Sequence, residues 1–275
     1  MTDDRRPWPP ALRATLGWHA LIAAAAAAAP AKWPLWLAAI AANHALLTAA
    51  GMMPRSVLLG PNLTRLPPAR CNAGRIALTF DDGPDPEVTP RVLDLLRDAG
   101  QRASFFCIGE RVAAYPALAQ RIVDDGHQIE NHTQRHRHHF ALLGPSGLRR
   151  ELLQAQQTIA RVAGTAPRFF RAPAGLRSPL LQPVLAALGL RLAAWTRRGL
   201  DTVDADARRV HARLTRALAE RDIVLLHDGN AARGAGNAPV VLQVLPGLLQ
   251  SMQAAGLASV PLREAVFPTG CADEA

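Results

Sequence analysis

Lysine is almost absent from this chain of 275 residues, in which 31 side chains are basic but only Lys32 is a lysine. Tyrosine occurs once, so few aromatic platforms beyond Phe and Trp are available for stacking on nucleic-acid bases. The arginines are dispersed along the chain, and the net charge of +9 therefore indicates an arginine bias rather than a nucleic-acid surface. We expect no nucleic-acid partner.

Cysteine is also scarce, and low-complexity composition is absent. Three cysteines are too few for a disulfide scaffold and lack zinc-finger spacing. Apolar residues make up 49% and charged residues 19% of the chain, which is typical of a folded protein and not of a disordered one. The length allows one large domain or two small ones.

Charge is missing from two segments near the N-terminus, residues 14–31 and 33–53, which Lys32 separates. A helix of about 21 residues spans about 31 Å, enough for a hydrocarbon core of about 30 Å, so the second segment is predicted to be a membrane helix. The first is mostly alanine and fits a span, a surface helix or a signal-peptide core. A pair of buried soluble helices is disfavoured because neither segment has a polar face.

Residues 1–54 are therefore predicted to form a membrane anchor of one or two helices, and residues 55–73, rich in proline and arginine, a linker. Residues 74–268 alternate short apolar runs with helical patterns, and residues 269–275 form a tail. Strands are predicted at 75–80, 103–108, 128–130, 168–171, 190–195, 222–226 and 257–260, and helices at 86–99, 115–125, 146–162, 178–188, 204–220 and 238–255. This alternation predicts parallel strands in a barrel or a wide open sheet, with chemistry at their carboxyl ends.

Adjacent carboxylates follow the first predicted strand. Asp81 and Asp82 come directly after Ile76–Phe80 and, because side chains alternate along a strand, they point in different directions. One carboxylate can then bind a metal while the other acts as a base. A solvated Asp-Asp-Gly-Pro turn is the alternative.

Histidines follow the third predicted strand. His132 and His136 are four residues apart, so on one helical turn they face the same way and can bind one divalent ion. Asp82 as a third ligand would leave a position open for water. A solvated histidine-rich loop is the alternative, and it suits His138 and His139 better.

Two further strand ends are polar. Arg171 leaves a strand of phenylalanines and needs a carboxylate partner if it is buried, for which Asp81 is suited. The following turn leaves the N–H groups of Ala174 and Gly175 open to a developing oxyanion. His227 ends a late strand and is the fourth polar cluster at this edge of the sheet.

These motifs occur in the order seen in polysaccharide deacetylases, which the sequence resembles over about residues 74–268. They are Thr79-Phe80-Asp81-Asp82-Gly83-Pro84, His132-Thr133-Gln134-Arg135-His136, Arg171-Ala172-Pro173-Ala174-Gly175 and Leu225-Leu226-His227. The resemblance implies a distorted seven-stranded (β/α) barrel, a divalent metal that is usually zinc, and hydrolysis of acetyl groups from N-acetylated sugars.

The resemblance also implies roles for individual residues. Asp81 would be the general base, held by Arg171, and His227 the general acid. Asp82, His132 and His136 would be metal ligands, and Leu225 would line the pocket for the acetyl methyl group. Two departures concern the substrate. Ala174, between Pro173 and Gly175, replaces a usual tyrosine, and the region where an aspartate pair with a tryptophan is usual reads Trp195-Thr196-Arg197-Arg198-Gly199-Leu200-Asp201-Thr202. Asp201 is the best candidate to orient His227, and Trp195 to wall the pocket.

We therefore expect a membrane-anchored, metal-dependent deacetylase acting on an N-acetylated glycan or glycolipid. O-deacetylation of a sugar ester and deformylation of a lipid-linked amino sugar are alternatives that use the same site. A catalytically silent glycan-binding module on a membrane anchor is disfavoured, because every catalytic position carries a competent residue type.

Topology depends on the number of spans. Arg5, Arg6 and Arg13 precede the first apolar segment and predict a cytoplasmic N-terminus. A single span places the catalytic domain outside the cytoplasm, where most acetylated glycans are, and this is the location we expect. A hairpin of two spans returns the domain to the cytoplasm, where a lipid-linked precursor suits it better, and the arginines after the second segment favour that hairpin. Cys107 is predicted to be a buried thiol, and a Cys71–Cys271 disulfide would indicate an oxidising compartment.

Overall fold

The computed structural model describes residues 8–268 of the chain. Its elements are, in order, α1 (Pro10–Ala28), η1 (Pro30–Lys32), α2 (Trp33–Met52), η2 (Arg70–Asn72), β1 (Arg75–Asp81), α3 (Thr89–Asp98), β2 (Ala103–Cys107), α4 (Gly109–Ala114), α5 (Pro116–Asp124), β3 (Gln128–Asn131), η3 (Phe140–Leu142), α6 (Pro145–Ala163), β4 (Phe169–Phe170), η4 (Pro173–Gly175), α7 (Leu181–Ala187), β5 (Arg191–Leu192), β6 (Arg197–Arg198), α8 (Ala207–Thr215), β7 (Ile223–His227), η5 (Ala235–Asn237), α9 (Val240–Ala254), β8 (Ala258–Ser259) and α10 (Leu262–Val266).

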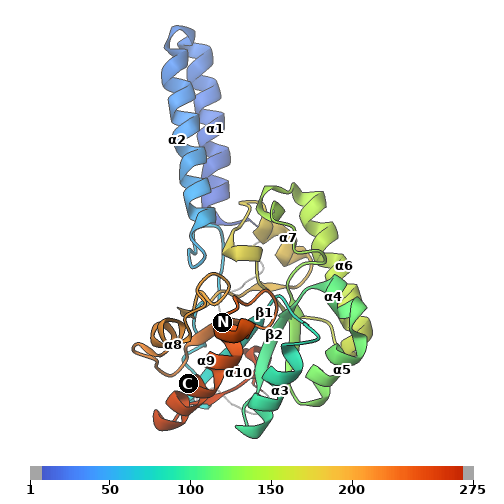
Figure 1. Cartoon of the computed structure of the whole chain (residues 1–275). Helices are drawn as coiled ribbons and strands as arrows, with labels where there is room; N and C mark the ends of the chain where they lie inside the picture. The colour runs from blue at the N-terminus through green and yellow to red at the C-terminus, as the bar shows by residue number, and fades with distance from the viewer. Residues whose placement is uncertain (1–7, 269–275) are drawn as a thin grey trace.

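One parallel sheet forms the centre of the larger part of the molecule. Its strands follow the order β5-β4-β3-β2-β1-β7-β6, and β8 pairs with the first residues of β1. Helices connect and cover the strands, and the sheet curls into an incomplete barrel (Figure 1). The predicted distorted seven-stranded (β/α) barrel is confirmed.

Alternation along β1 separates an outer core from the barrel interior. Ile76, Leu78 and Phe80 pack in the large hydrophobic cluster shared with the covering helices. Ala77 packs on the other face, in a cluster with Phe106, Phe169, Trp195 and Leu225. By the same alternation, Thr79 and Asp81 face the interior of the barrel.

The register of the strands brings their carboxyl ends to one edge. Asp81 lies opposite Phe106 of β2 and His227 of β7, and Asn131 of β3 lies opposite Phe170 of β4. The residues that follow these ends include Asp82, His132 and Arg171. The predicted polar motifs therefore share one end of the barrel, as expected for parallel strands.

The segment predicted as a linker contributes to the barrel wall. Leu63 forms a parallel bridge with Ala193 just beyond β5, and Arg65 an antiparallel bridge with Asp222 just before β7. Thr196 Oγ1 also donates to the Thr64 carbonyl at 2.9 Å. Residues 63–65 thus lie between the two ends of the curled sheet, where the sheet itself does not close.

Helices α1 and α2 lie side by side and project from the barrel as a rod (Figure 1). Segments Pro10–Ala28 and Pro30–Met52 are long and apolar enough to cross a membrane, by length and composition. At the base of this hairpin, Leu12, Leu47, Ala50 and Leu59 form a small cluster of their own. Two apolar N-terminal helices, as predicted, are present.

Candidate active site

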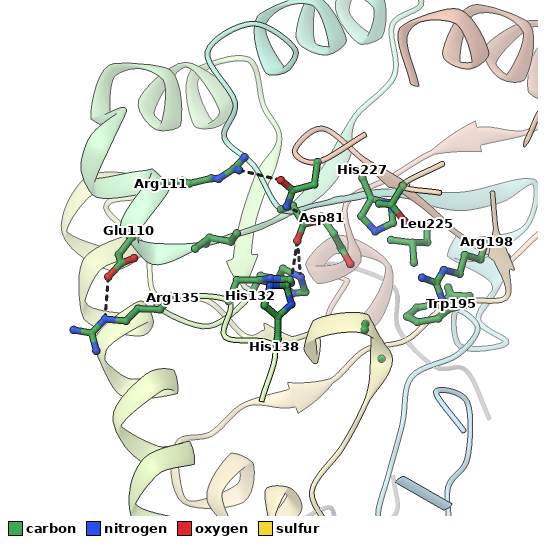
Figure 2. Close-up of a pocket in the computed structure, with 17 residues that line it drawn as sticks. Asp81, Glu110, Arg111, His132, Arg135, His138, Trp195, Arg198, Leu225 and His227 are labelled. Atoms are coloured by element: carbon green, nitrogen blue, oxygen red, sulfur yellow. Dashed lines mark hydrogen bonds and ion pairs between the residues drawn. The ribbon is translucent and has the colours of Figure 1, made fainter. Parts of the chain in front are cut away.

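A cavity of about 560 Å³ opens at the carboxyl ends of the strands. Figure 2 shows Trp195, Arg198, Leu225 and His227 along one side of it, Glu110, Arg111 and Arg135 on the other, and His138 between them. Asp81, Asp82, His132, His136, Ala174 and Gly175 also line it. The structure therefore brings all four predicted motifs to one cavity.

Asp82, His132 and His136 form the centre of the cluster. One ligand atom from each lies within 4.8 Å of the others, and Asp82 Oδ1 is 3.1 Å from Nε2 of both histidines. Asp82 is in the left-handed region, with φ of 74°, which turns its side chain away from the direction that Asp81 takes. Its second oxygen accepts a hydrogen bond from Asn230 Nδ2 at 3.1 Å.

The two histidines meet in a loop and not on a helical turn, so that part of the prediction is wrong. His136 has φ of 50°, and its N–H donates to Thr133 Oγ1 at 2.8 Å. Thr133 itself has φ of 67°. These left-handed residues fold the loop back so that the imidazoles converge by another route, with ring centroids 4.8 Å apart.

The donor set fits a divalent cation. The Nδ1–H of His132 donates to the Arg171 carbonyl at 2.9 Å, so Nε2 is the nitrogen that faces Asp82 and whose lone pair binds a cation when the ring is neutral. Asp82 Oδ1 is buried and accepts no hydrogen bond from any described residue. Two imidazole nitrogens and a carboxylate oxygen are ligands that Zn²⁺ accepts. A cation bound between them would explain why these lone pairs lie so close together.

Charges in the cluster shift its protonation. Burial raises the pKa of Asp82, but the neighbouring imidazoles, His132 first, lower it more, so its pKa lies below the ordinary value. Burial lowers the pKa of His136 to about 4, and the charge of His132 acts in the same direction. His136 is therefore neutral at pH 7, and its nitrogen lone pair is available.

Asp81 is held by a buried ion pair. Arg171 Nη1 donates to Asp81 Oδ1 at 2.6 Å, and the two side chains are 1% and 5% exposed. The other guanidinium nitrogens of Arg171 donate to the carbonyls of Ala193 and Ala194, at 3.2 and 2.9 Å, so the group has few conformations available. Burial lowers the pKa of Arg171, and the charge of Asp81 opposes that shift. The predicted contact between Arg171 and Asp81 is present.

His227 has its own buried carboxylate. Its Nδ1 lies 2.9 Å from Asp201 Oδ1, and its backbone N–H donates to Asp201 Oδ2 at 2.8 Å. Burial lowers the pKa of His227, but the charge of Asp201 and their hydrogen bond raise it to about 9. The ring is therefore protonated at pH 7, with Nε2 as the nitrogen not bound to Asp201.

The substrate-binding predictions divide. Ala174, Gly175, Trp195 and Leu225 line the cavity, whereas Pro173 is buried in the turn η4 and does not line it. The N–H of Gly175 donates to the Ala172 carbonyl at 2.9 Å and is not open to an oxyanion. Ala174, with φ of 53°, keeps its predicted place at the cavity.

Sequence reasoning missed several pocket residues. Asn230 reaches the metal-site carboxylate from the loop after β7, and Arg111 Nη2 donates to Asn230 Oδ1 at 3.2 Å. Arg198 lines the opposite side. The polar run that follows His227 was the available signal for Asn230. Arg198 stands in the region that departs from the family motif, but no role was predicted for it.

The curled parallel barrel and the Asp-His-His cluster at the carboxyl ends of its strands place this protein among the (β/α)-barrel proteins that have a candidate metal site at that edge. The sequence model of the family "Polysaccharide deacetylase" matches residues 70–193. A chitooligosaccharide deacetylase of Azorhizobium caulinodans is 33% identical over 201 residues, which cover 70% of this chain and 94% of that one. The chain belongs to the polysaccharide deacetylase family.

Two other similarities agree with this membership. A peptidoglycan-N-acetylglucosamine deacetylase of Bacillus cereus is 40% identical over 104 residues, which span 38% of each chain. A crystal structure of a peptidoglycan N-acetylglucosamine deacetylase superposes with a TM-score of 0.68 at 25% identity, covering 76% of this chain and 94% of that one. The barrel is thus the part that these proteins share.

Proposed function

We propose that this protein is a metal-dependent deacetylase that hydrolyses the N-acetyl group of an acetylated amino sugar in a glycan or glycolipid. The observation that carries the proposal is the convergence of three groups on one cavity: the Asp82-His132-His136 cluster, the Arg171–Asp81 pair and the Asp201–His227 pair. The names of the relatives, which are chitooligosaccharide and peptidoglycan deacetylases, support this substrate class.

Asp82, His132 and His136 would hold the cation, which we assign as Zn²⁺ from the nitrogen and oxygen donors. A cation bound there supplies a Lewis acid that polarises the acetyl carbonyl and acidifies water. Asn230 and the Arg171 carbonyl orient the ligands through Asp82 and His132 respectively. The residues that would bind the cation and the residues that orient these ligands therefore follow different strands.

Asp81 acts as the general base. Arg171 binds its Oδ1, which leaves Oδ2 to accept a proton from the attacking water. The guanidinium favours the charged carboxylate at a buried position, where an unpaired charge would otherwise be neutralised. The proton therefore moves from water to Asp81 as the carbon–oxygen bond forms.

His227 acts as the general acid. Asp201 binds Nδ1, so Nε2–H is the donor available to the leaving nitrogen, and the raised pKa keeps that proton in place at neutral pH. The C–N bond breaks as the proton is transferred, and acetate and a free amine are the products. Ala174 N–H would stabilise the oxyanion, Leu225 would contact the acetyl methyl, and Trp195 would form the wall against the sugar.

Residues 1–54 serve as the membrane anchor, residues 55–73 join it to the catalytic unit of residues 74–268, and residues 269–275 are outside the described residues. The sequence prediction of an external domain assumed a single span. The antiparallel hairpin of α1 and α2 supports two spans instead, which return the domain to the side of the N-terminus (Figure 1). With arginines on both flanks, we place that side in the cytoplasm.

Acetate release from a panel of N- and O-acetylated and N-formylated sugars tests this function. We expect full-length, metal-loaded protein to release acetate from N-acetylated sugars and to stop when a chelator removes the metal. Preferential release from O-acetyl sugars, or of formate, would select the esterase or deformylase alternative. Sugar binding without release from any substrate would select the silent module.

A further inference from the structure

The helical hairpin is attached directly beside the catalytic cavity. At the end of α2, the Gly51 carbonyl accepts a hydrogen bond from Arg177 N–H at 3.0 Å, and a Cβ on Gly51 would overlap the Arg177 carbonyl. Arg177 Nη2 donates to the Ser56 carbonyl at 2.8 Å. Pro54 packs on Gly175, where an added Cβ would lie 2.7 Å from the proline ring. Because Gly175 lines the cavity, the cavity edge lies two residues beyond α2.

The outer surface of the hairpin suits hydrocarbon and not water. Four of its polar side chains meet between the two helices: Thr15 bonds Asn43 at 3.3 Å, and His19 lies 3.3 Å from His44. Apart from His44, Arg13 in the first turn of α1 and Lys32 at the tip of the hairpin, the exposed large side chains are apolar. Seven of them are between 56% and 64% exposed: Leu16, Leu21, Trp33, Leu35, Leu37, Leu46 and Met52. This is the arrangement of helices packed within a bilayer.

A hairpin that spans the bilayer would place the cavity at the membrane surface. In that position α2 leaves the hydrocarbon near Met52, and the contact of Pro54 with Gly175 holds the cavity at the level of the lipid headgroups. Apolar side chains continue beyond the helix at this level: Met53, Val57, Leu58 and Leu176 are 54%, 67%, 41% and 36% exposed. A polymer would have to enter between the barrel and the bilayer, whereas a sugar attached to a lipid is already there.

One cavity wall carries a cation that no acidic side chain within residues 8–268 neutralises. Arg135 pairs with Glu110 at 2.9 Å, and Arg111 lies 3.8 Å from Asp85. Arg198 pairs with no carboxylate among residues 8–268, and its Nε is buried without a hydrogen bond. Its guanidinium lies 5.3 Å from the Trp195 ring centroid, on the His227 side of the cavity (Figure 2).

A second such cation lies between this wall and the hairpin. Arg55 follows the hairpin closely, and within residues 8–268 its guanidinium makes one long hydrogen bond, in which Nη1 donates to the Thr196 carbonyl at 3.5 Å. Arg197, in contrast, is engaged by Asp222 at 2.6 Å. Arg55 and Arg198 thus lie along the wall formed by Trp195 and Thr196. Unpaired guanidinium groups bind phosphate well, because their planar donors match its oxygens.

We propose that the substrate is an acetylated amino sugar joined through phosphate to a membrane lipid. Arg198 and Arg55 bind the phosphate, while the acetamido group lies against the Asp82-His132-His136 cluster. This inference rests on the proposed deacetylase function and narrows its substrate. The reaction is unchanged: water cleaves the amide, acetate leaves, and the amino sugar stays on its lipid.

Comparing three substrates distinguishes recognition of the phosphate from presentation of the sugar at the membrane. The full-length, metal-loaded protein in phospholipid nanodiscs is given N-acetylglucosamine linked by phosphate to a polyisoprenyl lipid, soluble N-acetylglucosamine 1-phosphate, or neutral chitotetraose. We expect kcat/KM for acetate release to be highest for the lipid-linked sugar, by about tenfold or more over chitotetraose. A neutral oligomer hydrolysed as well as the lipid-linked sugar overturns the inference and leaves the deacetylase function standing.

The soluble sugar phosphate separates phosphate recognition from membrane presentation. Equal kcat/KM for it and for the lipid-linked sugar would overturn the lipid part of the inference. No acetate from any of the three substrates would instead contradict the proposed function itself.

Arginine variants test the binding groups. Arg198→Gln is expected to lower the preference for phosphate-linked over neutral substrate by about tenfold, mainly through KM. Arg55→Gln, at an exposed position outside the barrel, repeats the test without disturbing the core. Arg208→Gln, on the exposed face of α8, is the matched control and keeps the wild-type preference. A preference unchanged in both test variants overturns the assignment of the phosphate site.

Discussion

The guanidinium of Arg171 and the carboxylate of Asp81 form a buried ion pair, with Nη1 and Oδ1 2.6 Å apart. The same arginine accepts a hydrogen bond from His132 through its carbonyl. One residue of the strand β4 end therefore orients both the proposed base and a proposed metal ligand. Its side chain contributes to the fold as well as to the chemistry.

Removing the arginine should destabilise the protein strongly. Arg171→Met leaves the Asp81 carboxylate buried without its counter-charge, which costs about 3–5 kcal/mol in free energy of unfolding. Arg208→Met, at an exposed position, should change it by less than about 0.5 kcal/mol. Denaturant unfolding of the two variants in one detergent compares them, and a similar small loss in both would contradict the importance of the pair.

Metal binding should depend on each member of the cluster. His136→Ala removes one of three ligands, so we expect stoichiometric metal to be lost together with acetate release. His138→Ala is the control, because His138 lines the cavity but is outside the cluster. Elemental analysis after dialysis measures the metal content of both variants, and an acetate assay measures their activity. Unchanged metal content in His136→Ala would show that this cluster is not the site.

The acid and the base should be separable from the metal. Asp81→Asn keeps the three ligands but removes the proton acceptor, so kcat should fall by about 100-fold or more with metal retained. His227→Ala should also keep metal, and should lose more activity on amides than on esters, because a leaving nitrogen needs the proton more. Near-native amide hydrolysis by both variants would contradict these roles.

The gathering of polar residues at one edge was predictable from sequence, because parallel strands place their carboxyl ends together. Asp81 and His227 are direct partners in the β1–β7 register, and no long-range information was needed to place them at the same edge. Strand β6 was not predictable, because Arg197-Arg198 contains no apolar run. It forms because β7 offers Val224 and Leu225 as pairing partners.

The conformation of the loop that holds the histidines, and the lack of a carboxylate partner for Arg198 within residues 8–268, could not be predicted from the sequence. The convergence of His132 and His136 depends on left-handed residues at Thr133 and His136, which no periodicity marks. The importance of Arg198 comes from the absence of any carboxylate near it in the described chain, which only three-dimensional placement reveals. The disulfide predicted for Cys71 and Cys271 stays a prediction, since Cys271 lies outside the described residues. Cys107 is buried in β2, as predicted.

The pH dependence of hydrolysis should follow the Asp201–His227 pair. Burial lowers the pKa of His227, but Asp201 first, with Asp81 and Asp82, raises it from 6.5 to about 9. Because the acid must be protonated, wild-type kcat should fall only as pH rises through the raised value. Asp201→Asn removes the charge that raises this pKa, and the basic limb should therefore move to lower pH. For Asp201→Asn we expect kcat at pH 8 to be about tenfold lower than kcat at pH 6. A basic limb unchanged by Asp201→Asn would exclude His227 as the titrating acid.

The orientation of the catalytic domain can be read from a reporter fused to the C-terminus in intact cells. Two spans return the barrel to the side of the N-terminus, and arginines before α1 and after α2 both favour the cytoplasm, so a reporter active only in the cytoplasm should be active. Leu21→Arg places a charge on the outer, 61% exposed face of α1, and is expected to abolish the first span and invert the reporter. The control Trp8→Arg, at the start of the described chain, should leave it unchanged. An extracytoplasmic reporter in the wild type would instead restore the single span and the external domain expected from the sequence.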